Sequence, residues 1–312
     1  MSKFFRNIGV YLLLIIAAVF AYFFRFAHLH QKEIPKGLRR EGPEWETYNI
    51  LLKEGLAWLQ GQQTEDLYIR SFDGLRLHGT YIPAENPRAC VILFHGYRSW
   101  GLRDYGILLP FYHKIGLSMV VVDQRACGES EGKYITFGAL ERQDALFWAR
   151  HMEEKLGGKT PLILDGISMG GATVLFSADL PLPETVVGLI ADCGFTSPWD
   201  IIAHCAKSWF HIPPFPMLYL MSILTKVIAG FGYKDCSSPE SLKHNTRPLL
   251  LLHGGADDFV PTDMSRQSFA ANAGWKKLFI VPEAGHGMSY MVDMERCQQE
   301  LIDYMDFVLG GR

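Results

Sequence analysis

Short apolar runs, each followed by small or polar residues, recur through most of the chain. They cover residues 90–94, 119–122, 161–165, 186–191, 248–252 and 277–281. Their length and their lack of alternation are typical of strands buried on both faces of a parallel sheet. Segments whose apolar residues recur at helical spacing lie between these runs at about residues 106–115 and 138–155, and another follows the last run at 292–309. Strands alternating with helices predict an α/β fold, with a mostly parallel sheet and helices on both faces.

The pattern changes at residues 66–83, where apolar and polar positions alternate on either side of Asp73-Gly74. This dipeptide is a hairpin turn signal, so we expect two antiparallel strands to precede the parallel ones. In sheets of this kind active sites lie at the carboxyl ends of the strands. The unusual residues of this sequence cluster there.

The first part of the chain has a different character. Residues 8–24 carry no charge, and a short basic tail with Lys3 and Arg6 precedes them. Such a length is at the lower limit for crossing a bilayer. The residues at the end of the run, 20–24, are mostly bulky and aromatic, unlike the small residues of a signal-peptide cleavage site. We therefore expect residues 1–30 to form an uncleaved single-pass membrane anchor, a transmembrane helix that places the protein at the cell membrane. Basic residues flank both ends, so the side of the membrane that holds the rest of the chain stays open.

Three regions follow from these patterns: the anchor at 1–30, a linker and packing helix at 31–65, and an α/β domain at 66–312. Apolar residues recur at helical spacing from Trp45 to Leu59, which predicts a helix packed on the α/β domain or, as the alternative, one lying on the membrane. Residues 194–242 are too long for a simple crossover. They are apolar and are interrupted by prolines, so we expect a small cap of several short helices.

The strongest chemical signal is Gly166-Ile167-Ser168-Met169-Gly170, placed between the apolar run at 161–165 and a predicted helix. A strand, a sharp turn and a helix form the context that a G-x-S-x-G nucleophile elbow requires. A Cβ at the flanking glycines would collide with neighbouring backbone. Ser168 is therefore the candidate nucleophile, and a serine that merely caps the helix is the alternative.

A serine hydroxyl needs a base, and the base needs an orienting acid. His286 lies in a glycine-flanked loop just after the run at 277–281, and Asp257 and Asp258 follow the run at 248–252. The order Ser, Asp, His matches that of hydrolases with this elbow. We expect Asp257 rather than Asp258 to orient His286. The backbone N–H groups of Met169 and Tyr97 are the expected oxyanion donors.

Composition adds mainly exclusions. The chain has 312 residues and a net charge of −3, which gives no reason to expect a nucleic-acid partner. Six cysteines show no C-x-x-C spacing, so we expect reduced core residues rather than disulfides. No metal-binding or cofactor motif is present, and we expect neither a metal nor a cofactor. The oligomeric state stays open.

Together these motifs resemble the α/β-hydrolase superfamily over residues 66–309. The resemblance rests on His95-Gly96, Asp123-x-Arg125-x-x-Gly128-x-Ser130, the elbow around Ser168, His253-Gly254-x-x-Asp257 and Gly285-His286. The segment Gly194-Phe195-Thr196-Ser197-Pro198-Trp199 is similar to that of membrane-anchored bacterial serine hydrolases of the BEM46-like and prolyl-oligopeptidase-like group. Cys127 departs from the pattern, since relatives more often carry histidine or another residue before the glycine.

The resemblance implies hydrolysis of an ester, thioester or amide through an acyl-enzyme. The apolar cap holds few charges, which favours a carboxylic ester of a small molecule or acyl group, with carboxylesterase activity preferred to peptidase activity. A serine peptidase or amidase, an acyltransferase, and a non-catalytic binding protein on the same scaffold are the alternatives.

Overall fold

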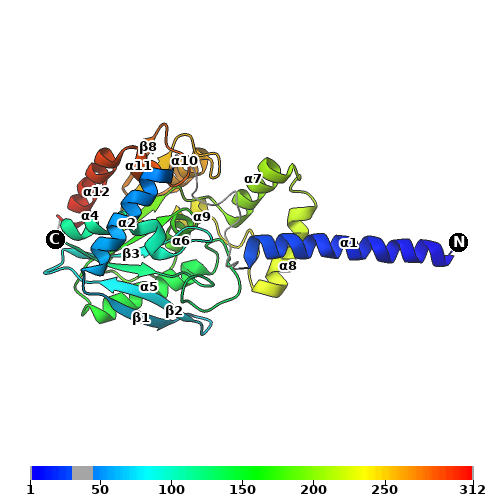
Figure 1. The fold of residues 1–312 in the computed structure, drawn as a ribbon, viewed down its shortest axis with the longest axis horizontal. Coiled ribbons are helices and arrows are strands. Elements are labelled where there is room, and N and C mark those ends of the chain that lie inside the picture. Colours follow the sequence, from blue (N-terminus) through cyan, green and yellow to red (C-terminus); the bar gives the residue numbers. More distant parts are fainter. Residues whose placement is uncertain (1, 30–44, 311–312) are drawn as a thin grey trace.

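The computed structural model describes residues 2–29 and 45–310, and its centre is one eight-stranded sheet (Figure 1). The spatial order is β1-β2-β4-β3-β5-β6-β7-β8. The strands are β1 (Glu65–Arg70), β2 (Arg76–Ile82), β3 (Ala89–Phe94), β4 (Leu117–Val122), β5 (Leu162–Ile167), β6 (Val186–Asp192), β7 (Leu249–Gly254) and β8 (Lys276–Val281). β1 and β2 pair antiparallel, as do β2 and β4, and the remaining pairs are parallel. The predicted hairpin and mostly parallel sheet are confirmed.

Two apolar cores flank the sheet, because its central strands are buried on both faces. Three helices cover one face: α5 (Glu141–Lys155), α6 (Met169–Ser177) and α10 (Thr262–Ala271). The other face is covered by α3 (Gly101–Tyr105), α4 (Leu109–Lys114), α11 (Ser289–Val292) and α12 (Met294–Leu309). Each parallel strand therefore ends at the same edge of a sheet that is shielded from water on both sides.

The helix expected within residues 31–65 is α2 (Glu46–Gln60). It packs on the catalytic domain, as predicted: Gly55 approaches the backbone of Gly106 so closely that a Cβ would lie 1.9 Å from its carbonyl oxygen. The ring of Trp58 also meets that of His113 edge-on at 5.2 Å. The linker before it, residues 31–44, lies outside the described residues.

The long crossover between β6 and β7 forms short helices, as the prolines predicted. α7 (Pro198–Phe210) and α8 (Met217–Ala229) stand apart from the sheet (Figure 1). α9 (Ser238–Leu242) instead packs on α6 and α10 in the body of the domain. Ser197 caps α7 by accepting a hydrogen bond from the backbone N–H of Asp200 at 3.0 Å.

The N-terminal helix, α1 (Ser2–His28), extends far from the sheet at its N-terminal end and lies beside α8 near its C-terminal end (Figure 1). Over the residues that the structure describes, no helix combines the length and apolarity needed to cross a bilayer. The spanning anchor expected at residues 1–30 is thus not supported. At the C-terminal end of this helix, Phe24 and His28 are buried in contacts with protein.

Candidate active site

Ser168 occupies the sharp turn between β5 and α6. Its backbone angles, φ 56° and ψ −113°, lie outside the regions that residues with a side chain prefer. The turn is fixed by its neighbours: the N–H of Ser168 donates to the carbonyl of Asp192 at 2.8 Å. A Cβ on Gly170 would lie 1.8 Å from the carbonyl oxygen of Phe94, and one on Gly166 would lie 2.1 Å from that of Gly170. The predicted need for glycine at both positions is confirmed.

His286 reaches this serine from the loop after β8. Its Nε2 lies 2.9 Å from the Oγ of Ser168, and its Nδ1 lies 2.8 Å from Oδ2 of Asp257. An Nδ1–H that donates to Asp257 leaves Nε2 as the acceptor for the serine hydroxyl. The structure thus brings Ser168, His286 and Asp257 into one hydrogen-bonded series, although 118 positions separate the first two residues in the chain.

Asp257 is held firmly in the loop after β7. Its Oδ1 accepts the backbone N–H groups of Phe259 and Val260 at 3.0 and 2.8 Å, and Nε2 of His253 lies 3.2 Å from its Oδ2. Burial alone would raise the pKa of this carboxyl group. Hydrogen bonds from His253 and His286 outweigh burial and hold the pKa well below its usual range. Asp257 is therefore a carboxylate at neutral pH.

The neighbouring Asp258 lies in different surroundings. It is exposed, and its backbone carbonyl, not its carboxylate, lies 3.2 Å from Nε2 of His204. His253 is buried between Ser265 and the carbonyl of Val260. It therefore braces the loop that carries Asp257.

The loop after β3 lies beside Ser168. His95 is buried, with Nδ1 2.7 Å from the carbonyl of Gly96 and Nε2 accepting the N–H of Gln124 at 3.0 Å. The N–H of Gly96 donates to Asp104. The next N–H, that of Tyr97, makes no hydrogen bond to any described part of the chain. Met169 is the first residue of α6, where helix N–H groups lack helical acceptors. Both donors expected from the sequence are thus available.

Within residues 2–29 and 45–310, Asp257 and His286 also belong to a group spaced closely enough to hold a metal ion. Ligand atoms of these two residues and Cys193 lie within 4.8 Å of one another. Burial raises the pKa of the Cys193 thiol well above its ordinary value, so the thiol stays protonated and is a poor ligand. His286 and Asp257 already hydrogen-bond each other. The chemistry of these donors does not fit a metal ion.

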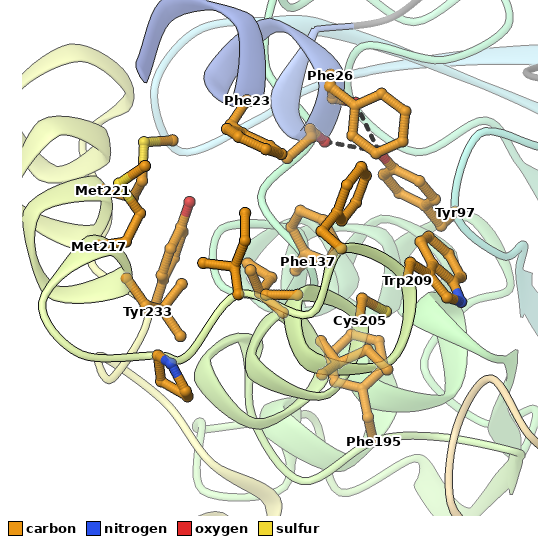
Figure 2. Close-up of a pocket in the computed structure, with 18 of the residues that line it drawn as sticks. Phe23, Phe26, Tyr97, Phe137, Phe195, Cys205, Trp209, Met217, Met221 and Tyr233 are labelled. Atoms are coloured by element: carbon orange, nitrogen blue, oxygen red, sulfur yellow. Dashed lines mark hydrogen bonds between the residues drawn. The ribbon is translucent and has the colours of Figure 1, made fainter. Parts of the chain in front are cut away.

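A cavity of about 940 Å³, including open space at its mouth, extends from Ser168 (Figure 2). Its walls come from the C-terminal end of α1, from α7, from the N-terminal half of α8 and from loops of the body. Among the described residues that line it, none is charged. Trp209 of α7, Met217 and Met221 of α8, and Phe195 after β6 are examples. Phe259 joins the cavity to the hydrogen-bonded series of Ser168, His286 and Asp257, because its ring meets that of His286 at 4.7 Å.

The sequence did not predict one wall of this cavity. Phe23, Phe26 and Ala27 of α1 line it, although they belong to the segment expected to lie in a membrane. The available signal was the aromatic, histidine-containing end of that segment. His28, which showed no supporting pattern in the sequence, is buried there with Nε2 2.7 Å from the hydroxyl of Tyr233.

The fold and these motifs define a hydrolase scaffold, and the comparisons agree. The model of the alpha/beta hydrolase family matches residues 91–300, and the chain belongs to this family. The uncharacterized protein YqkD of Bacillus subtilis is 23% identical over 238 residues, which cover 76% of this chain and 78% of the relative. A Saccharomyces cerevisiae protein, named as an uncharacterized membrane protein, is 26% identical over 239 residues, which cover 75% of this chain and 77% of the relative.

Among solved structures, the esterase Pf2001 of Pyrococcus furiosus superposes with a TM-score of 0.64 and 20% identity. The match covers 80% of this chain and 93% of the esterase. At this identity the likeness establishes the shared fold. The narrower resemblance to the BEM46-like group stays a prediction.

Proposed function

We propose that the protein is a serine hydrolase that cleaves a carboxylic ester or thioester with an apolar acyl group. The observation that carries the proposal is the hydrogen-bonded series of Ser168, His286 and Asp257 at the base of a cavity without charged lining residues. A nucleophile, a base and an orienting acid in this geometry support acyl transfer. The Pyrococcus furiosus protein named above supports the proposal, since it is an esterase with the same fold.

In the proposed reaction Oγ of Ser168 attacks the carbonyl carbon while Nε2 of His286 takes the hydroxyl proton. The negative charge on the carbonyl oxygen is received by the backbone N–H groups of Tyr97 and Met169. The carbon–oxygen or carbon–sulfur bond then breaks, and the leaving alcohol or thiol takes the proton from His286. Water, deprotonated by His286, attacks the acyl carbon. The bond between that carbon and Oγ of Ser168 breaks, His286 returns the proton to Oγ, and the acid is released. Asp257 remains a carboxylate and stabilises the charged imidazole.

The lining of the cavity favours an ester over a peptide substrate. Apolar walls hold an acyl chain, whereas recognition of a peptide's amino terminus needs a carboxylate. The carboxylates of residues 194–242 are otherwise engaged. Asp235 pairs with Lys226, Glu240 pairs with Lys243, and Asp200 accepts hydrogen bonds from Thr196 and Ser197. Peptidase activity is therefore the less favoured candidate.

Steady-state kinetics of the full chain test the proposal. We expect turnover of p-nitrophenyl esters, little turnover of a matched series of dipeptide anilides, and a loss of turnover in Ser168→Ala at an unchanged melting temperature. Full activity of the folded Ser168→Ala variant would refute the assignment. A clear preference for the anilides would move the function to a peptidase.

We also propose that the protein works at a membrane. Residues 8–24 are free of charge, side chains such as Tyr11, Leu14 and Ile15 on α1 are more than half exposed, and the yeast relative is named a membrane protein. Exposed apolar side chains of this kind favour a lipid surface. In cell fractionation the chain is expected with membranes and released by detergent rather than by salt. Recovery in the supernatant without detergent would contradict this.

A further inference from the structure

The C-terminal end of α1 is built into the catalytic domain. His28 is fully buried, with Nδ1 3.0 Å from the carbonyl of Ile135 and Nε2 2.7 Å from the Tyr233 hydroxyl. Leu29 pairs with Tyr134 in an isolated β-bridge, and Phe24 meets the ring of Tyr134 edge-on at 5.6 Å. Specific contacts of this kind fix the position of the end of α1 relative to the sheet.

The same end closes one side of the cavity. Phe23, Phe26 and Ala27 line it together with residues of α7 and α8. Figure 2 shows both phenylalanines on α1 at one side of the space, with Phe23 on the side of Met217 and Met221 and Phe26 beside Tyr97. The rings of Phe23 and Phe26 meet that of Phe210, at the end of α7, edge-on at 5.3 and 5.9 Å. These aromatic contacts join α1 to the cap.

The end of α1 is also tied to the loop that offers the oxyanion donor. The hydroxyl of Tyr97 lies 2.8 Å from the carbonyl of Ala27 and 3.2 Å from that of Phe26, as the dashed lines of Figure 2 indicate. The guanidinium of Arg98 donates a hydrogen bond to the carbonyl of Phe26. It also lies 5.2 Å from the ring centroid of Phe26 and 5.0 Å from that of Tyr97. A cation and a hydroxyl at the C-terminal carbonyls are favourable partners for a helix end. The wall and the catalytic loop are therefore fixed to each other.

We propose that Phe23, Phe26 and Ala27 of α1 determine which acyl chains the enzyme accepts. The inference deepens the proposed ester hydrolysis and rests on it. The substrate class is an ester or thioester of an extended aliphatic acyl chain, which runs from Ser168 between α7 and α8 and ends against α1. Side-chain volume at this wall then sets the longest chain that fits, because a close-packed apolar pocket discriminates single methylene groups.

Acyl-chain profiles of full-length variants test the proposal. The ratio of kcat/KM for p-nitrophenyl octanoate to that for the acetate is measured in one detergent. Ala27→Phe adds volume to the wall, so we expect this ratio to fall about tenfold. Phe26→Ala removes volume, so the preferred ester is expected to shift towards the palmitate. Phe23→Leu removes less volume, and its acyl-chain profile tests the proposal if Phe26→Ala does not fold.

Tyr11→Ala is the matched control, since it removes an exposed aromatic side chain of the same helix that does not line the cavity. Its profile should equal the parental one. Parental ratios in folded Ala27→Phe and Phe23→Leu, or an equal shift in Tyr11→Ala, would overturn the proposal. Labelling rates of Ser168 with short- and long-alkyl fluorophosphonates give a second readout that needs no turnover.

The two proposals fail in different ways. Turnover or labelling that persists in Ser168→Ala refutes the hydrolase mechanism, whatever the chain-length profile. Labelling that requires Ser168 but has the same chain-length dependence in every α1 variant leaves the mechanism intact and removes the role of α1.

Discussion

At the scale of single residues, Asp257 and Asp258 are adjacent in the chain but differ in their environments. Asp257 is buried and accepts hydrogen bonds from two backbone N–H groups and from His286. Asp258 is exposed, and its carboxylate takes no part in this network. Replacing each in turn by asparagine therefore separates the proposed orienting acid from a carboxylate that is merely nearby.

Asp257→Asn is expected to lower kcat by about 10³- to 10⁴-fold, because an amide no longer holds His286 in the tautomer that accepts the serine proton. Asp258→Asn is the matched control and should keep a kcat near the parental value. Kinetics on one p-nitrophenyl ester, with melting temperatures to verify folding, provide the measurement. Equal losses in both variants would exclude the assignment of Asp257.

The sequence predicted the members of this series because the signals are local. The elbow around Ser168, the glycine-flanked loop of His286 and the acidic pair each follow a recognisable apolar run. The choice between Asp257 and Asp258 depends on side-chain direction in an irregular loop. The structure resolves that direction through the backbone N–H groups of Phe259 and Val260.

At the scale of elements, the junction of β5 and α6 depends on close backbone approach at Gly170. A Cβ there would lie 1.8 Å from the carbonyl oxygen of Phe94 in β3. Gly170→Ala is expected to destabilise the fold by several kcal/mol, on the order of the most damaging core substitutions. Thermal unfolding measures the effect.

Gly61→Ala is its control, because a Cβ at this exposed position would meet its nearest neighbour, the carbonyl of Trp58, at an ordinary 3.4 Å. A melting temperature of Gly170→Ala equal to that of Gly61→Ala would contradict the packing described for the elbow.

The attachment of α1 is expected to depend on pH through His28. Burial lowers the pKa of this imidazole from 6.5 to about 4. Between pH 6.5 and about 4 the imidazole is therefore protonated in the unfolded chain but still neutral in the folded chain. The stabilisation present above pH 6.5 is lost as the pH falls towards 4. The loss is on the order of 3 kcal/mol. His28→Gln retains a donor and an acceptor, so its stability should change less between these pH values.

Denaturant unfolding of the parent and of His28→Gln between pH 6.5 and 4 measures whether the free energy of unfolding falls with pH. An acid-induced loss of stability in His28→Gln as large as that of the parent would assign the effect to other groups. Stability of the parent that rises as the pH falls would contradict the burial of a neutral His28.

At this scale the sequence was less informative about α1. An uncharged run has the same composition whether its partner is lipid or protein, so residues 8–24 could not reveal that the helix continues into contacts with α7, α8 and the loop of Tyr97. Those contacts involve residues far apart in the chain, such as His28 and Tyr233. The packing of α2 was easier to predict, because its apolar positions recur at regular helical spacing.

At the scale of the whole molecule, the two ends of α1 are expected to differ in importance. Deletion of residues 1–15 removes exposed apolar side chains and should leave the melting temperature and the soluble ester kinetics near parental values. Deletion of residues 1–29 removes Phe24 and His28 from their buried sites and opens one wall of the cavity. The second deletion should lower the melting temperature and abolish chain-length preference.

Both deletions are compared with the full chain in the same detergent. Identical melting temperatures and acyl profiles for the two would show that the end of α1 contributes nothing to the catalytic domain. That result would remove the basis for assigning α1 to the active site.

The sheet as a whole was well predicted, since its strands are short apolar runs whose spacing reflects the intervening helices. The cap was predicted only as a set of short helices. Its division, with α9 in the body and α7 and α8 around the cavity, depends on contacts with α6, α10 and α1 that no local pattern encodes.

The central claim, that Ser168 is a nucleophile activated by His286, is tested most directly by fluorophosphonate labelling of the full chain with peptide mapping of the adduct. We expect one phosphonylated site at Ser168, and a loss of labelling in both Ser168→Ala and His286→Ala. Absence of labelling in the folded parent, or an adduct on a different residue, would contradict the account.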